Sequence, residues 1–546
     1  MNSLKPMLLT CLKSYDKSQF IKDVTAGIIV AIIALPLSIA LALASGVGPE
    51  AGIFTAIVAG FVISALGGSC VQIAGPTAAF ATIVAGIVAR DGMDGLIIAT
   101  IMAGIFLILM GLFHFGSLIK FIPYTITTGF TSGIAVTIVI GQLKDFFGVT
   151  YPDGVKPIET TAKMKAFVQN ISSVNTDALI VGIVSLAILI LAPYIFKKVP
   201  GSLIAVIVGI LMVQFLPLKV STIGNLYTIS NSLPSFHMPA IRFSIISASV
   251  SNAFTIAVLA AIESLLSCVV ADGMINSKHR SDMELVAQGA GNIASALFGG
   301  IPATGAIART AANIKNGGRT PIAGMVHSVT LIIVLVVLMP YAGMIPMPTI
   351  AAILFIVAYN MCQWRTFRDL VRTAPKSDIL VLIVTFVLTV IFDLVVAIEI
   401  GMVLACLLFI KRMSEETHAD SWVYTDDDTP DIDEHLQKLP LQIRVYEITG
   451  PLFFGAADAI EHIVVKDFTR CLVLRMRGVP ALDSTAMNAL QNLVKTCESK
   501  GITLVFSHVN EQPMHVMEKA GFVELVGKEN FQSNISAALK RAEEVI

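Results

Sequence analysis

Two stretches of sequence decide the fold: Val71-Gln72-Ile73-Ala74-Gly75-Pro76-Thr77-Ala78-Ala79-Phe80 and Gly299-Gly300-Ile301-Pro302-Ala303-Thr304-Gly305-Ala306. Each places a Gly/Pro break before a short helix of small residues, and the two lie in different halves of a very apolar chain. Such a helix is too short to cross a bilayer alone, and paired broken helices predict a substrate site at the membrane midplane between two repeats. Because a helix N-terminus exposes unpaired N–H groups and carries partial positive charge, the two stretches favour an anionic substrate.

The composition of the chain places most of it in the lipid bilayer. Of its 546 residues, 55% are hydrophobic and 14% are charged, and its mean hydropathy is +0.81, whereas a soluble domain has about 25% charged residues. The net charge of −1 and the lack of a basic run predict no nucleic-acid partner. The seven scattered cysteines indicate neither a metal site nor a disulfide framework. Without a P-loop or a nucleophilic triad, we expect neither a cofactor nor an enzymatic activity.

The hydropathy pattern predicts a polytopic α-helical membrane protein with about 14 membrane segments, by the length needed to span a bilayer. The segments are expected at 25–45, 49–67, 77–90, 95–116, 121–143, 177–196, 202–216, 250–272, 283–299, 303–315, 322–340, 347–362, 378–394 and 395–411. Segments three (77–90) and ten (303–315) fall short of a full span. They occupy equivalent positions if the chain is a seven-plus-seven inverted repeat, in which they are the two half-helices.

The distribution of Lys and Arg predicts the orientation. With the N-terminus inside, the basic clusters at 278–280, 315–319, 365–376 and 411–412 all fall on the cytoplasmic side, as the positive-inside rule requires. We therefore expect a multi-pass protein of the bacterial inner (plasma) membrane with both termini cytoplasmic. Helix three then runs outward and helix ten inward, so their N-termini meet near the midplane.

Composition also predicts the domain organisation. Residues 1–24 form a cytoplasmic N-terminal segment, 25–413 a transmembrane transport domain, 414–437 an acidic linker and 438–546 a cytoplasmic α/β domain. In the last domain, alternation and apolar runs indicate strands at 441–449, 471–476 and 502–507. Helical periodicity appears at 456–466, 484–499, 511–520 and 531–545.

Several stretches carry a resemblance to a known family: Ala34-Leu35-Pro36-Leu37-Ser38-Ile39-Ala40-Leu41-Ala42, Ala44-Ser45-Gly46, Gly75-Pro76-Thr77-Ala78, Ala261-Ile262-Glu263-Ser264-Leu265-Leu266-Ser267, Glu284-Leu285, Gln288-Gly289, Gly291-Asn292 and Ala308-Arg309-Thr310-Ala311-Ala312-Asn313. The chain resembles the SulP (sulfate permease) family of anion transporters over essentially its whole length. Its tail resembles a STAS domain, through Gly478-Val479-Pro480-Ala481-Leu482-Asp483-Ser484-Thr485-Ala486. Within the family it is most similar to carriers of C4-dicarboxylates. The resemblance implies a core domain, a gate domain, elevator-type motion and a homodimer.

The substrate-binding residues are expected at the two helix starts. A single Pro such as Pro76 is tolerated at the first position of any helix, but its counterpart Pro302 in the other half favours a site. Backbone N–H groups would come from the residues that follow each break, and the resemblance adds two leucines of segment one. The expected set is Pro76, Thr77, Ala78, Ala79, Gly305, Ala306, Ile307 and Ala308, with Leu37 and Leu41. Many relatives have Gln where Leu37 stands, which makes this pocket more apolar and slightly favours a carboxylate over sulfate.

Arg309, in short segment ten, is the expected positive charge of the site. An Arg inside a membrane is costly unless it is paired or faces water. One interpretation is that Arg309 attracts the anion by its field or by direct contact. The other is a structural pair with a carboxylate or with helix-end carbonyls.

Glu263, within segment eight, is the expected cation-coupling residue. A lone intramembrane carboxyl is a functional hypothesis by default, and burial favours its neutral form, so it can bind and release a proton. The resemblance links an acidic residue here to cation coupling. Ser267 lies four residues on, on the same helix face, which leaves a sodium site open. A third interpretation is that Glu263 only neutralises Arg309.

The tail carries one further hypothesis. Ser484 stands where regulatory STAS domains are phosphorylated, although an N-cap role for Asp483 or Ser484 is the simpler explanation. A cytoplasmic protein partner of this domain is a further expectation.

The sequence as a whole predicts proton-coupled uptake of a dicarboxylate or similar small anion. The alternatives within the class are a sodium-coupled bicarbonate or sulfate transporter and an uncoupled exchanger. The alternative from another class is a membrane-tethered STAS regulatory module.

Overall fold

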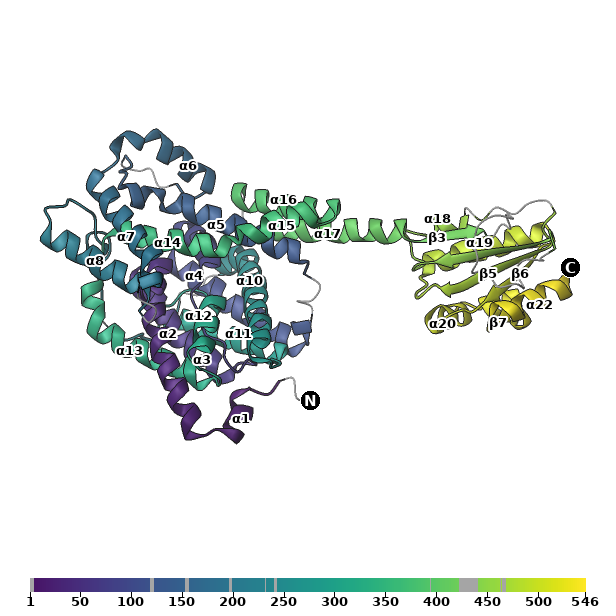
Figure 1. The fold of residues 1–546 in the computed structure, drawn as a ribbon, viewed down its shortest axis with the longest axis horizontal. Helices are drawn as coiled ribbons and strands as arrows, with labels where there is room; N and C mark the ends of the chain where they lie inside the picture. Colours follow the sequence, from purple (N-terminus) through teal and green to yellow (C-terminus); the bar gives the residue numbers. More distant parts are fainter. Residues whose placement is uncertain are drawn as a thin grey trace. The chain divides into compact units, whose positions relative to one another are not determined.

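The chain folds into two compact units, Met1–Met402 and Val403–Ile546 (Figure 1). The computed structural model describes residues 4–117, 122–152, 157–195, 199–230, 232–239, 243–392, 394–421, 440–461, 463 and 468–546. Residues 422–437 of the predicted acidic linker therefore lie outside the described residues, as do 462 and 464–466 of the helix predicted at 456–466. The first unit is helical, and the second contains a five-stranded sheet.

Helices in the first unit follow the predicted membrane segments closely. They are α2 (Lys17–Ala44), α3 (Pro49–Leu66), α4 (Ala81–Leu112), α5 (Tyr124–Phe147), α7 (Thr176–Ile195), α8 (Gly201–Phe215), α10 (Phe243–Ile275), α11 (Ser281–Leu297), α12 (Ile307–Lys315), α13 (Ile322–Ala342), α14 (Met347–Cys362), α16 (Lys376–Ile391) and α17 (Leu394–Glu415), the last of which runs into the second unit. Short helices that hydropathy does not reveal are α1 (Leu8–Cys11), α6 (Thr160–Gln169), α9 (Ile223–Leu226) and α15 (Trp364–Thr373), with 3₁₀ turns η1 (Leu12–Ser14) and η4 (Ile171–Ser173). Eight helices within the described residues are long and apolar enough to cross a bilayer.

The two predicted short segments differ in detail from expectation. The predicted segments 77–90 and 95–116 are joined in α4 across a kink at Gly92, whose φ of 71° lies in the left-handed region that glycine tolerates. The first of them starts as a 3₁₀ turn, η2 (Ala78–Phe80), and not as an α-helix at 77. The second, α12, starts at Ile307 and not at 303, because residues 304 and 305 pair as a strand.

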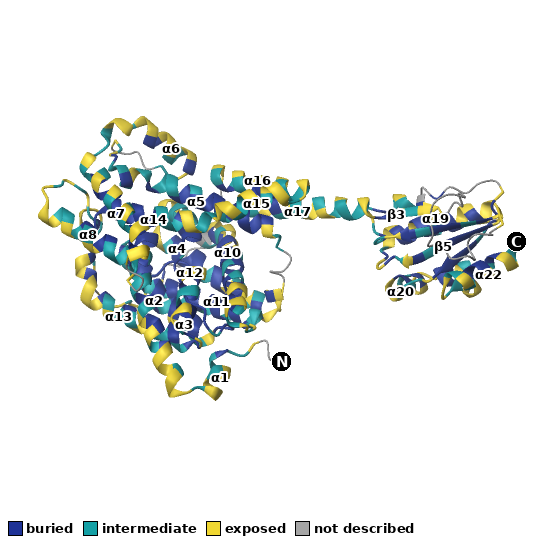
Figure 2. Cartoon of the chain, viewed as in Figure 1, coloured by how far each residue is buried: buried dark blue, intermediate teal, exposed yellow. Residues whose placement is uncertain are grey.

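Helices of the first unit pack as two bundles. In one bundle α4 packs against α10 and α11, α3 against α11 and α13, and α2 against α13; in the other α5 packs against α14 and α16, and α7 against α8 and α14. Small residues permit the closest approach: a Cβ added to Gly104 would lie 2.7 Å from the Gly289 carbonyl oxygen, so α4 and α11 meet backbone to backbone. Buried residues concentrate in the first bundle, around α3, α11 and α12 (Figure 2).

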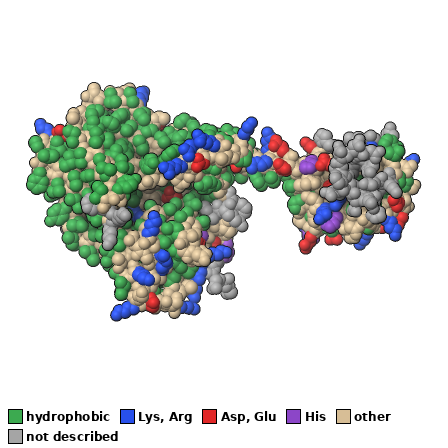
Figure 3. Space-filling model, in the orientation of Figure 1, with side chains coloured by type: hydrophobic (Ala, Val, Ile, Leu, Met, Phe, Trp, Pro, Cys, Tyr) green, Lys and Arg blue, Asp and Glu red, His purple; other side chains and the backbone are tan. Residues whose placement is uncertain are grey.

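Apolar side chains also cover the outside of the first unit. Tyr194 and Phe215 are each 80% exposed and Ile333 is 61% exposed, and hydrophobic side chains spread over this unit in the space-filling view (Figure 3). A soluble monomer rarely exposes a continuous apolar surface of this extent. Its position on long apolar helices fits contact with lipid.

The second unit has an α/β core. Its sheet has the order β3 (His418–Ser421), β4 (Ile443–Thr449), β5 (Cys471–Gly478), β6 (Thr503–Ser507), β7 (Phe531–Gln532), with β3 antiparallel to β4 and the rest parallel. Leu472 and Leu474 face one hydrophobic cluster and Cys471 and Val473 the other, as strand alternation requires. The helices are α18 (Asp458–Glu461), α19 (Ser484–Ser499), α20 (Glu511–Lys519), α21 (Phe522–Val526) and α22 (Ile535–Val545), with a 3₁₀ turn η6 (Lys528–Asn530).

Candidate functional site

The two Gly/Pro stretches cross each other inside the first unit. Each contributes a two-residue strand, β1 (Ala74–Gly75) and β2 (Thr304–Gly305), and these pair antiparallel with Ala74 opposite Gly305. The N–H of Ala306 donates to the carbonyl oxygen of Ile73 at 2.9 Å and extends the pairing. Both short helices start directly after this crossing, so their first-turn N–H groups lie close together. These N–H groups have no partner within their own helices.

Side chains of the second repeat hold the first stretch in position. The Thr310 hydroxyl oxygen accepts the N–H of Ile73 at 3.1 Å, and the Asn313 amide donates to the carbonyl oxygen of Val71 at 2.9 Å. In the other stretch, the Asn292 side chain both donates to the Ala303 carbonyl oxygen (2.9 Å) and accepts the Ala303 N–H (2.8 Å). The backbone N–H and C=O groups at each break have no helical partners. Polar side chains from α11 or α12 form hydrogen bonds with them instead.

The predicted substrate-binding residues surround this crossing with different accessibilities. Leu41, Pro76, Ala78, Ala79 and Gly305 are buried, Leu37, Thr77 and Ala306 are partly exposed, and Ile307 and Ala308 are exposed. The surface available to a solute is therefore formed by the partly exposed and exposed positions.

Arg309 lies behind the crossing and is 1% exposed. Its Nη2 donates to the hydroxyl of Ser38 at 3.3 Å and to the carbonyl oxygen of Pro76 at 3.2 Å. Its Nε and Nη1 have no hydrogen-bond partner among the described residues, and no carboxylate in that part of the chain lies within ion-pair distance of it. The expected pair with a carboxylate is therefore not formed, whereas contact with a carbonyl at the break is. The guanidinium joins α12 to α2 and to the Gly75–Pro76 break.

Helix α10 contacts both breaks through successive polar residues. Glu263, which is partly exposed, accepts a hydrogen bond from the Thr77 hydroxyl at 2.9 Å. One residue on, the Ser264 hydroxyl accepts the Gly305 N–H at 3.0 Å and lies 2.6 Å from the Thr304 hydroxyl. Ser267 is buried and donates to the Thr310 hydroxyl at 3.5 Å. The Glu263 carboxyl therefore contacts the start of the first half-helix, while Ser267 faces the second.

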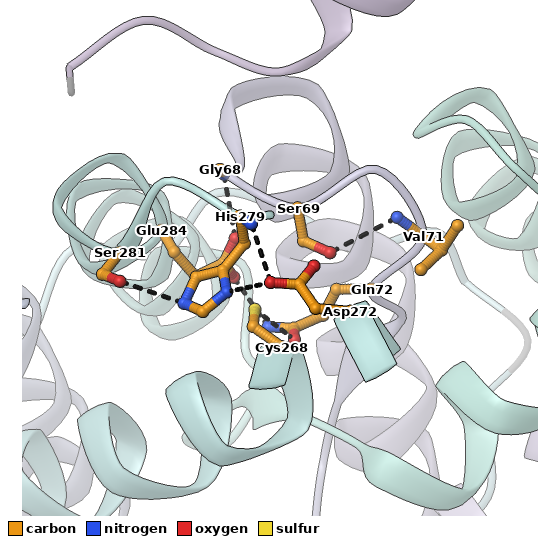
Figure 4. A network of polar contacts seen from close by, with 9 residues as sticks. All are labelled: Gly68, Ser69, Val71, Gln72, Cys268, Asp272, His279, Ser281 and Glu284. Carbon is orange, nitrogen blue, oxygen red and sulfur yellow. Dashed lines mark hydrogen bonds and ion pairs between the residues drawn. The ribbon is translucent and has the colours of Figure 1, made fainter. Parts of the chain in front are cut away.

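A buried polar network that sequence reasoning missed supports the crossing from one side (Figure 4). Glu284 is fully buried and accepts hydrogen bonds from the Gly68 N–H (2.9 Å), the Gln72 amide (2.7 Å) and the Gln288 amide (2.9 Å). Gln72 in turn accepts from the Cys268 thiol at 2.8 Å. In the sequence, Glu284 stood out only as part of a stretch that carries the family resemblance, without a role of its own. The available signal was its spacing of four residues from Gln288, which puts the two on one helix face.

At the start of α19 in the second unit, Asp483 is the N-cap. Its carboxylate accepts the N–H groups of Thr485 and Ala486, each at 2.9 Å, and that of Phe454 at 2.8 Å. Ser484 is exposed at the first helical position. The cap role therefore belongs to Asp483, and the Ser484 hydroxyl faces solvent.

This arrangement defines a polytopic membrane transporter, since a membrane anchor needs no broken helices that meet within it. Comparison with known families makes the assignment specific. The chain belongs to the sulfate permease family, whose model matches residues 20–385, and a STAS domain matches residues 438–538. The family and the relatives named below are transporters of anions, not enzymes.

Relatives in bacteria share nearly the whole chain. The "Putative sulfate transporter YvdB" of Bacillus subtilis is 39% identical over 95% of this chain and 97% of its own length. The "Bicarbonate transporter BicA" of a Picosynechococcus species is 32% identical over 95% of this chain and 94% of its own. The solved transmembrane domain of a cyanobacterial BicA covers 70% of this chain and 98% of its own length, with a TM-score of 0.64 and 30% identity.

The solved structure of SLC26A9 shares the fold of the whole chain. It covers 99% of this chain and 93% of its own, with a TM-score of 0.88 and 19% identity. The expected fold, a helical membrane domain of repeated segments followed by a STAS domain, is thereby confirmed. The expected similarity to C4-dicarboxylate carriers is not supported by these relatives, whose names refer to sulfate and bicarbonate.

Proposed function

We propose that this protein is a secondary active transporter that takes up a small anion together with a proton. The single observation that carries the proposal is Arg309, a buried cation at the crossing with two nitrogens unpartnered among the described residues. A buried donor without an acceptor is costly. An anion bound at the two helix starts would supply acceptors to it.

The anion would be held by the two helix starts. N–H groups at Ala78 and Ala79 and at Ile307 and Ala308 would donate to it, as helix N-termini do to anions. Arg309 would donate to it through Nε or Nη1 and would add positive field. Leu37, which is partly exposed, would contact the apolar part of the substrate, and this supports a carbon-bearing anion such as a dicarboxylate.

Proton coupling would follow from the contact between Thr77 and Glu263. An ionised Glu263 beside the first half-helix repels an anion bound there, and a neutral one does not. Proton and anion would therefore bind cooperatively. Ser267, hydrogen-bonded to Thr310, would belong to the coupling region through the second half-helix.

A second candidate is sodium-coupled transport of bicarbonate or sulfate; the names of the relatives at 32% and 39% identity favour these two substrates. Sodium would then bind near Glu263 and Ser267. The two candidates share the anion site and differ in the coupling ion and the substrate.

Alternating access would move the bundle that carries the crossing against the bundle of α5, α7, α8, α14 and α16, as an elevator. We propose that residues 25–413 form this transport domain in a homodimer of the inner membrane. The N-terminal segment 1–24, the linker 414–437 and the STAS domain 438–546 would then be cytoplasmic. The STAS domain would bind a cytoplasmic partner, with Ser484 available for phosphorylation.

The test is uptake into proteoliposomes that contain the purified full-length protein. Succinate, fumarate, sulfate and bicarbonate are offered with and without an inward proton gradient, and sodium is varied separately. Proton-driven succinate or fumarate uptake supports the first candidate. Sodium-driven bicarbonate or sulfate uptake supports the second, and uptake of none of the four anions contradicts both.

The role of the membrane domain is tested by truncation. A protein that ends at residue 437 should still transport the anion if the site lies in the membrane domain. Loss of uptake by a truncated protein that remains folded would instead favour the STAS module as the functional part.

A further inference from the structure

We propose that Cys11 and Cys70 are a modification site at which a reversible disulfide forms and fastens the N-terminal segment to the loop that leads into β1. Their sulfur atoms lie 3.6 Å apart, although the residues are separated by 59 positions in the sequence. A disulfide bond is about 2.05 Å long, so the two sulfurs need to approach by about 1.5 Å. Both side chains are partly exposed, and a small reagent therefore reaches them.

The N-terminal segment is already docked where the disulfide would form. The N–H of Met7 donates to the Gly67 carbonyl oxygen at 2.8 Å. The Arg280 guanidinium donates to the carbonyl oxygen of Lys5 at 2.8 Å and to the hydroxyl of Thr10 at 3.0 Å. These contacts hold the end of α1 beside the loop, so pairing of the thiols requires no large rearrangement.

The loop of residues 67–73 links this docking site to the crossing. Its Gly68 carbonyl oxygen accepts the Arg280 N–H at 2.9 Å, and its Gly68 N–H donates to Glu284. Further along the loop, Gln72 donates a hydrogen bond to Glu284. Gln72 also packs directly against Gly305 of the second stretch: a Cβ added to Gly305 would lie only 2.3 Å from the Gln72 Nε2. A covalent bond at Cys70 therefore acts on a segment that ends at the crossing.

The environment of the pair favours thiol chemistry at Cys70. The hydrogen bond from the Cys11 thiol lowers the pKa of Cys70 to about 7, with burial opposing it and Ser277 assisting. The same hydrogen bond, together with burial, raises the pKa of Cys11. Near neutral pH a substantial fraction of Cys70 is therefore thiolate, whereas Cys11 retains its proton. Thiolates and not thiols attack disulfides.

The reaction is a thiol–disulfide exchange with a low-molecular-weight disulfide such as oxidised glutathione. The Cys70 thiolate attacks one sulfur of the reagent, a mixed disulfide forms, and one small thiolate leaves. Cys11 then loses its proton to that thiolate and attacks the Cys70 sulfur, which releases the second small thiolate. Two electrons pass from the cysteine pair to the reagent, and excess reduced thiol reverses the reaction. If this face is cytoplasmic, the disulfide is a transient response to oxidation.

The test equilibrates the purified full-length protein in buffers with different ratios of reduced to oxidised glutathione. After quenching and alkylation, non-reducing peptide mapping detects a Cys11–Cys70 linked peptide, and amide hydrogen exchange follows residues 7–14. We expect the linked peptide to rise with oxidised glutathione and to disappear with dithiothreitol. Exchange at residues 7–14 should slow roughly tenfold in the oxidised protein, because the segment is then tethered at both ends.

Variants identify the sulfurs involved. Cys11→Ser and Cys70→Ser should each abolish the linked peptide, and the matched control Cys406→Ser, at an exposed cysteine of α17, should retain it. Failure of the wild-type protein to form the linked peptide, or glutathione adducts in its place, overturns the proposal. If the disulfide forms but hydrogen exchange at residues 7–14 is unchanged, the proposal that it fastens the N-terminal segment is overturned.

Discussion

Substitution of Gly75 by Ala is the sharpest perturbation of the proposed anion site. The added Cβ would lie 2.3 Å from Nη1 of Arg309 and 3.7 Å from Cα of Ala56. Gly75 is not among the residues with positive φ, so its backbone accepts Ala. The guanidinium is the flexible partner, and it must retreat by about 1 Å to reach ordinary contact distance.

A shift of that size changes the hydrogen bonds of Arg309. Its Nη2 contacts, at 3.3 Å to Ser38 and 3.2 Å to the Pro76 carbonyl, are already long, and a retreat of about 1 Å breaks them. A hydrogen bond to a charged group contributes about 1.5–3 kcal/mol. If the anion loses one such contact, its apparent affinity falls about 10- to 100-fold, because 1.4 kcal/mol corresponds to a factor of ten.

The assay is the concentration dependence of anion uptake in proteoliposomes. Gly75→Ala is compared with Gly86→Ala, a matched substitution in α4 whose Cβ meets nothing within 4 Å. We expect a 10- to 100-fold rise in KM for Gly75→Ala and none for the control, with both proteins folded at the assay temperature. Wild-type KM and maximal rate in a folded Gly75→Ala protein would refute the role of Arg309 in anion binding.

Three further predictions concern single contacts. Glu263→Gln should abolish acceleration of uptake by an inward proton gradient while anion exchange persists, and full accumulation by this variant would contradict proton coupling. Thr77→Val should weaken the gradient dependence and Thr77→Ser should restore it, because only Ser keeps the donor to Glu263; equal behaviour of the two variants would show that the hydroxyl is irrelevant. Asp483→Ala should destabilise the start of α19 by about 1–2 kcal/mol, measured by hydrogen exchange of the first-turn amides, and unchanged exchange would argue against the cap.

Regular parts of the fold were predictable because local sequence encodes them. Long apolar runs gave the membrane helices, and the Gly92 turn fell between the two predicted segments that it separates. Alternation predicted β4 and a continuous apolar run predicted β5, two core strands of the STAS domain. The Gly/Pro breaks also indicated where both short helices begin, since η2 starts at Ala78 and α12 at Ile307, directly after them.

The contacts that build the site were not predictable in the same way. The Ser38–Arg309 hydrogen bond joins residues 271 positions apart, and the Thr77–Glu263 bond joins residues 186 apart. No periodicity within one segment encodes such partners. The start of α12 was misplaced for a related reason: pairing of β2 with β1, a tertiary contact, overrides the local helical pattern there.

The lack of a carboxylate partner for Arg309 bears on both stability and function. A buried carboxylate beside the guanidinium would neutralise it permanently and would compete with an anionic substrate for the same donors. In this protein the two carboxyls near the crossing, the partly exposed Glu263 and the buried Glu284, are engaged elsewhere: Glu263 by Thr77, and Glu284 by Gly68, Gln72 and Gln288. Both carboxyls therefore accept their hydrogen bonds from groups other than Arg309. The polar network therefore preserves the positive field that the proposed transport mechanism requires.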